Sequence, residues 1–206
     1  MELVVLNVAY PFAPVGPDVP GDAEKALAHL DAALAQAGHE SFVMACEGSM
    51  TQGILLATPR PSAQIYDTER RHSHEQYRYI LRTFLKKWPI DLIHMHGGDF
   101  YEYLPPPGVP VLVTLHLPID QYPEMIFHLD RPQTFLHCTS ASQRRACPPC
   151  AYLLPEIEDI AAPELIATAL GKYFAIYERL VAEARALETA AVAPGQRLFE
   201  PAAISA

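Results

Sequence analysis

The sequence predicts an α/β fold, in which a parallel sheet carries helices on both faces. Segments with a strand pattern alternate with segments with a helix pattern along most of the 206 residues. Two of the later strand segments, 91–97 and 110–118, are continuous apolar runs. Such runs are typical of strands that helices cover on both sides.

The first half of the chain supplies three strands and two helices. The expected strands cover residues 2–9, 40–46 and 53–59, and the expected helices cover residues 22–37 and 67–87. Asp22 is expected to cap the first helix, with Gly21 before it to free the turn, and Gly38 is expected to end that helix in the left-handed conformation. Asp67 or Thr68 would begin the second helix, and Pro89 would end it.

The second half adds strands, a short helix and one long helix. Strands are expected at 91–97, 110–118 and 133–140, with a last short strand at 151–156. A short helix capped by Ser140 or Ser142 would lie between the last two, and an amphipathic helix would cover 164–188. We therefore divide the chain into a domain of residues 1–155, a closing helix within 156–189 and a loose tail at 190–206.

Composition excludes several classes of protein. The net charge of −9 argues against a nucleic-acid partner and against a basic membrane anchor. No apolar run reaches the roughly 20 residues of a membrane span, and the first residues form a strand pattern and lack the features of a signal peptide. Four cysteines do not indicate a secreted disulfide framework. We expect a cytoplasmic protein.

Polar residues follow most of the predicted strands directly. The segments YPFAP, CEGS, HGGD, HLP and TSASQ come after the first, second, fourth, fifth and sixth strands. In an open parallel sheet, ligands bind beyond the carboxyl ends of the strands. The sequence therefore predicts a binding site at this edge.

Five of the segments together resemble a known family. VAYPFAPVGPDVPGDAEKAL, AGHESFVMACEGS, DLIHMHGGDFYEYLP, VLVTLHLP and CTSASQRRACP occur in the order found in the N-terminal domain of family 4 glycosyltransferases, the group 1 sugar transferases of GT-B architecture. The resemblance covers roughly residues 1–150. It implies a Rossmann-like domain that binds the acceptor of a cytoplasmic, metal-independent transferase.

The chain departs from that family after residue 150. The family's donor-binding domain should follow there, but the sequence passes to a segment that resembles the family's final crossing helix. The resemblance thus implies an acceptor half whose nucleotide-sugar domain comes from a separate protein or from a homo-oligomer with a rebuilt cleft. No cofactor is expected, although a nucleotide sugar could serve as donor substrate.

The resemblance and the strand ends together nominate the site residues. His116, placed where the family often carries a histidine near the transferred sugar, is the catalytic candidate, although a structural hydrogen bond would also explain it. The binding candidates are Gly21, Asp22, His96, Gly97, Asp99, Ser140 and Arg144. Asp99 could bind an acceptor sugar or cap the following turn, and we favour the cap. Asp22 stands where the family has a second glycine, so we expect a capped helix at this turn and no bound phosphate.

Other conspicuous residues are given structural roles. His94 and His96 should point to one face of their strand, but a third metal ligand is not evident and no metal is expected. Cys147 and Cys150 have a redox spacing, yet Cys147 follows a short helix and does not begin one, so we expect a structural pair. The basic segment 70–78 could bind a ligand or form a solvated helix surface, and we expect the solvated surface.

Three functions remain open at this point. The first is a glycosyltransferase, or its acceptor half, that transfers a hexose from a nucleotide sugar to a hydroxyl acceptor. The second is a non-catalytic carbohydrate- or nucleotide-binding module that derives from such an enzyme. The third is a scaffold that interacts with other proteins.

Overall fold

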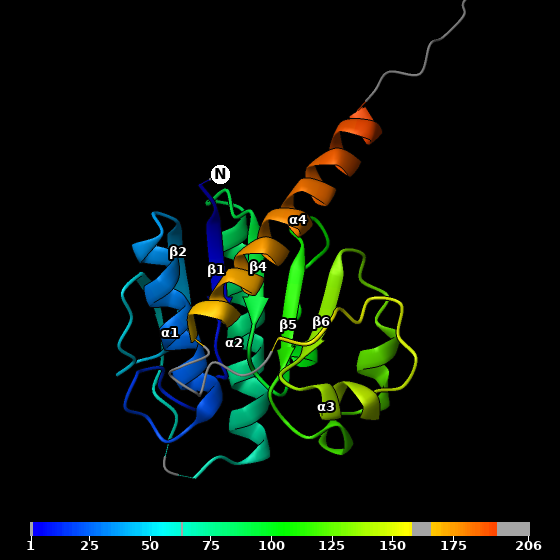
Figure 1. The fold of residues 1–206 in the computed structure, drawn as a ribbon. Coiled ribbons are helices and arrows are strands. Elements are labelled where there is room, and N and C mark those ends of the chain that lie inside the picture. Colours follow the sequence, from blue (N-terminus) through cyan, green and yellow to red (C-terminus); the bar gives the residue numbers. More distant parts are fainter. Residues whose placement is uncertain (1, 63, 158–165, 193–206) are drawn as a thin grey trace, which may run out of the picture.

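Six parallel strands form one sheet in the order β3-β2-β1-β4-β5-β6 (Figure 1). The computed structural model describes residues 2–62, 64–157 and 166–192. The strands are β1 (Val4–Val8), β2 (Glu40–Cys46), β3 (Ile54–Thr58), β4 (Leu92–Met95), β5 (Val111–Leu115) and β6 (Thr134–Cys138). This order, with its reversal between β1 and β4, is that of the Rossmann-like fold, which confirms the predicted fold class.

Helices cover both faces of the sheet. The α-helices are α1 (Asp22–Gln36), α2 (Asp67–Leu85), α3 (Ala141–Ala146) and α4 (Ile166–Val192), and three short 3-10 helices lie at Phe100–Glu102, Ile119–Gln121 and Glu124–His128. Helices α1 and α4 lie on one face, and α2 lies on the other (Figure 1). The apolar stripes that the sequence predicts for these helices therefore all face the sheet.

The alternation of side chains along the strands separates two core layers. Leu6, Ile93 and Val113 point towards α2, where they pack with Tyr77 and Leu81. The neighbouring strand positions point towards α1 and α4. This second layer contains Val5, Leu92, Leu112, Leu30, Leu34, Tyr173, Tyr177 and Leu180. The long closing helix thus packs back on the sheet, as the sequence predicts.

Three local expectations need correction. Residues 151–156 form only one bridge, between Leu153 and Leu136, in place of a strand. Gly21 is the N-cap of α1 and Asp22 is its first helical residue, so Asp22 does not cap the helix. Helix α2 ends at Leu85, several residues before Pro89. By contrast, the left-handed Gly38 after α1 (φ 81°) and the Ser140 cap of α3 are as predicted.

The proposed tail at 190–206 lies mostly outside the described residues, and so do residues 158–165 directly before α4, where the closing helix was expected to begin. In Figure 1 the C-terminal part of α4 extends past the end of the sheet. Within the described part of the chain, no helix has the length and apolar content that a membrane crossing requires.

Candidate functional site

A cavity of about 580 Å³ lies at the carboxyl ends of β1, β4 and β5. Its lining comes from the start of α1, the first half of α2 and the loops after those strands. The lining residues are Tyr10, Gly21, Asp22, Ala23, Glu24, Arg70, His96, Gly98, Asp99, His116 and Leu117. This is the point where the strand order reverses, and the topology of an open sheet leaves a crevice there. Five of the predicted site residues meet in it: Gly21, Asp22, His96, Asp99 and His116.

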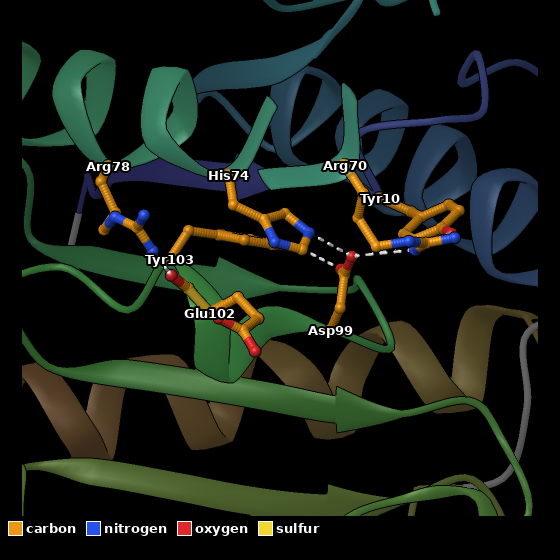
Figure 2. A network of polar contacts seen from close by, with 7 residues as sticks. All are labelled: Tyr10, Arg70, His74, Arg78, Asp99, Glu102 and Tyr103. Carbon is orange, nitrogen blue, oxygen red and sulfur yellow. Dashed lines mark hydrogen bonds and ion pairs between the residues drawn. The ribbon is translucent and has the colours of Figure 1, made fainter. Parts of the chain in front are cut away.

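Asp99 is the centre of a polar network beside this cavity (Figure 2). One carboxylate oxygen lies 2.7 Å from Nε2 of His74, and the other accepts a hydrogen bond of 2.9 Å from the hydroxyl of Tyr103. The guanidinium of Arg70 approaches to 3.8 Å. His74 and Arg70 both project from α2, one turn apart, towards the loop after β4. The carboxylate is therefore held in one orientation from several sides.

This network corrects the prediction that Asp99 caps the following turn. Asp99 does precede the 3-10 helix Phe100–Glu102, but its side chain makes no capping hydrogen bond. Burial and the nearby Asp99 carboxylate raise the pKa of Tyr103 well above its usual value, so this hydroxyl keeps its proton and remains a donor. Arg78 also donates to the backbone carbonyl of Glu102, which fixes the same loop to α2.

His96 and His116 line the cavity from the ends of the neighbouring strands β4 and β5. Nδ1 of His96 lies 3.3 Å from Nε2 of His116, so one of the two rings donates a hydrogen bond to the other. Burial, with a smaller effect of the nearby His137, lowers the pKa of His116 to about 3. Burial and the nearby His116 hold the pKa of His96 well below its ordinary value. Both imidazoles are therefore neutral at pH 7 and act as hydrogen-bonding groups.

Gln143 positions the segment that carries His116. Its amide nitrogen donates to the carbonyls of Leu115 and Leu117, both at 2.7 Å, and its amide oxygen accepts from the backbone N–H of Thr139. The helix α3 that presents Gln143 follows β6, the neighbour of β5 in the sheet. One side chain thus holds the backbone on both sides of His116.

The start of α1 is occupied by a side chain of the protein itself. Gly21 has an extended conformation and no side chain caps the helix. The carboxylate of Glu24 turns back over Gly21, and a Cβ atom at residue 21 would collide with its Oε2. Because a helix N-terminus favours an anion, this carboxylate takes the place that a phosphate would need. Asp22 was expected from the sequence to disfavour a phosphate at this turn, but the carboxylate that lies over Gly21 is that of Glu24.

The remaining predicted residues do not line this cavity. Gly97 packs against the hydroxyl of Tyr103, and its neighbour Gly98 lines the cavity in its place. Ser140 accepts a hydrogen bond from the N–H of Gln143 and only caps α3. Arg144 lies 3.6 Å from the carboxylate of Glu156 and borders a separate cavity that Cys147 and Cys150 also line.

The cysteines and histidines form neither a disulfide nor a metal cluster among the described residues. Cys147 lies with its sulfur 3.5 Å from that of Cys138, the last residue of β6. Burial raises the pKa of both thiols, so neither is activated as a nucleophile. His94 shares its face with His96, as predicted, but bonds to Tyr177 and Thr114 inside the core.

Four residues with polar side chains at or beside the cavity were not predicted from the sequence: Tyr10, Glu24, Arg70 and His74. The expectation of a solvated surface for residues 70–78 is wrong for His74, which is 5% exposed. A signal was present, because His74 precedes the buried Tyr77 and Leu81 by three and seven residues and so shares their helix face. Arg70 lies one turn before His74 on that face.

Comparison with known protein families gives no family model that matches this chain. The curated proteins contain no match to the sequence either. The case for a function therefore rests on the geometry of the site.

Proposed function

We propose that this chain is the acceptor-binding half of a GT-B type sugar transferase. It would hold a polyhydroxylated acceptor, while a second chain or a second copy of this chain supplies the nucleotide-sugar domain. The observation that carries the proposal is the cavity at the strand ends, where hydrogen-bonding side chains from separate elements converge. Its volume of about 580 Å³ lies within the usual range for small-molecule sites.

The chemistry of the lining suits sugar hydroxyls. A hydroxyl group both donates and accepts hydrogen bonds. Asp99 can only accept, Arg70 can only donate, and the neutral His116 can do either, so the cavity offers both kinds of partner. With a pKa of about 3, His116 is a weak base at pH 7, and its proposed role is to orient a hydroxyl by hydrogen bonding.

A second candidate is a carbohydrate-binding module without catalysis. The position of the Glu24 carboxylate at the start of α1 favours it, because in the resembled family the donor's phosphates lie near this turn. The acceptor half and the binding module share the sugar site and differ in whether a donor is ever consumed.

Sugar binding is the first test. Ligand-observed NMR titrations with glucose and mannose should give saturable binding, and His116→Ala should weaken it about fivefold, the size of one lost hydrogen bond. His72→Ala is the matched control, because His72 is an exposed histidine on α2 outside the cavity, and it should bind like the wild type. Absence of saturable binding for both sugars would overturn the proposal.

Donor chemistry and mass in solution test how the first candidate would obtain its donor domain. The acceptor half alone should release no nucleoside diphosphate from UDP-glucose or GDP-mannose, and UDP should bind more weakly than the sugars. Release of diphosphate by the purified chain would show that no separate donor domain is needed. Light scattering tests whether the chain forms a homo-oligomer. A dimer would support a cleft rebuilt from two copies, whereas a monomer would mean that an acceptor half needs a separate donor protein.

A further inference from the structure

The cavity has an excess of negative charge. Three carboxylates line it, those of Asp22, Glu24 and Asp99, against one guanidinium, that of Arg70. The two histidines that line it, His96 and His116, are neutral at pH 7 because burial lowers their pKa. A ligand with a negative charge would therefore enter an unfavourable field.

The single cation is already engaged. Arg70 lies 3.8 Å from the Asp99 carboxylate, donates to the hydroxyl of Tyr10 at 3.3 Å, and stacks over the ring of Phe12. Lys25, the nearest basic residue along α1, pairs with Asp22 on the exposed side. Asp22 and Asp99 are thus both compensated within the protein.

Glu24 differs from these two carboxylates, because the start of α1 stabilises it through a backbone hydrogen bond and a cationic side chain does not. It is 9% exposed and lines the cavity, yet no cationic side chain pairs with it in the part of the chain that the structure describes. Burial raises the pKa of Glu24, and a hydrogen bond from its own backbone N–H offsets this rise only in part, while the nearby Asp22 adds to it. A buried carboxylate without a cation is unfavourable, and either a proton or a bound cation relieves it.

We infer that the ligand of this cavity is a polyhydroxylated compound that carries a protonated amine, such as an amino sugar, and that the ammonium group binds the Glu24 carboxylate. The inference rests on the proposed sugar site and narrows its ligand class. Hydroxyl groups of the ligand would meet Asp99, Arg70 and His116, and the amine would meet the start of α1. Phosphorylated sugars are excluded by the same carboxylate.

Four ligands of one ring type test the inference in buffer with EDTA at pH 7: glucosamine, N-acetylglucosamine, glucose and glucose 6-phosphate. Glucosamine should bind about tenfold more tightly than glucose, as expected for a charge-assisted hydrogen bond. N-acetylglucosamine, whose nitrogen is part of an uncharged amide, should lose this advantage, and glucose 6-phosphate should bind most weakly. This ranking is measured on the wild-type protein and needs no variant.

Variants then assign the effect to one residue. Glu24→Gln should remove the advantage of glucosamine over glucose, whereas Glu75→Gln, which removes an exposed carboxylate of α2 outside the cavity, should retain it. Equal binding of glucose and glucosamine by the wild type would overturn the inference and leave the proposed sugar site standing. Absence of binding for all four ligands would overturn both proposals. Tightest binding of glucose 6-phosphate would overturn the inference, because it would show that the cavity prefers an anionic ligand.

Discussion

At the scale of single residues, the site is built by side chains whose partners are distant along the chain. Asp99 meets His74 across 25 residues, and Gln143 reaches the carbonyls of Leu115 and Leu117 across 28 and 26 residues. Each of these side chains is polar and held by several hydrogen bonds. Such residues fix the geometry of a cavity even where they do not line it.

Gln143→Glu tests the positioning of His116. The substitution keeps the shape of the side chain and the acceptor for Thr139, but it places a carboxylate oxygen against two carbonyl oxygens. We expect a loss of about 1–3 kcal/mol in the free energy of unfolding, measured by urea denaturation. The ring proton resonances of His116 should also shift in NMR spectra.

The control for this change is Gln121→Glu, at an exposed glutamine of the 3-10 helix Ile119–Gln121. It introduces the same charge without facing a carbonyl cluster, so stability should stay within about 0.5 kcal/mol of the wild type. An unchanged His116 signal and unchanged stability in Gln143→Glu would contradict the positioning role.

At the scale of elements, one buried carboxylate joins α1 to β2 and to the loop before β3. Asp31 of α1 is fully buried and accepts hydrogen bonds from the hydroxyl of Ser41 and from the backbone N–H groups of Gln52 and Gly53. This contact fixes α1 against the edge of the sheet. It thereby supports the helix start that borders the cavity.

Asp31→Asn should loosen that contact. An amide supplies one acceptor oxygen and turns an NH₂ group towards the backbone donors, so a buried N–H loses its partner. We expect the free energy of unfolding to fall by about 2–3 kcal/mol in urea denaturation. Glu47→Gln, at an exposed position after β2, should be neutral, and equal stability of the two variants would contradict the proposed joint.

At the scale of the whole molecule, four histidines gather on the face of the sheet that α4 covers. His94, His96, His116 and His137 lie on β4, β5 and β6 or at their ends, and Thr114 connects His94 to His137. Burial lowers the pKa of His137 to about 4 and that of His116 to about 3, and it holds the pKa of His94 and His96 well below the usual value. The folded protein therefore excludes protons that the unfolded chain binds below about pH 6.5.

Stability should decrease steeply in mild acid. Because the folded pKa values lie below the unfolded ones, the contribution of these histidines is fully present above about pH 6.5 and is lost as the pH falls below it. Each histidine loses roughly 1 kcal/mol between pH 6.5 and pH 5.5, so the four together lose up to about 4 kcal/mol. Urea denaturation at the two pH values measures this loss.

Two variants check the origin of the effect. His116→Gln should reduce the pH dependence by about one proton, and His72→Gln, at an exposed histidine, should leave it unchanged. A free energy of unfolding that stays constant between pH 6.5 and pH 5.5 would contradict the assignment.

The sequence by itself determined the alternation of strands and helices, the parallel sheet and the edge at which the cavity lies. These follow from hydrophobic periodicity and from the position of turns, which are local properties of the chain. Local capping was predicted less well: Ser140 caps α3 as expected, but Gly21 takes the place expected for Asp22. Side-chain hydrogen bonds at a helix start depend on neighbours that the local pattern does not specify.

Only the tertiary structure decided which polar residues meet. It joined His74 and Arg70 of α2 to Asp99 and separated Ser140 and Arg144 from the cavity. It also turned Glu24 over Gly21, at the glycine turn where the sequence had raised the question of a phosphate. The physical reason is that the partners of a buried polar or charged side chain are set by packing between elements that are distant in the sequence. Hydrophobic periodicity indicates only which face of each element is apolar.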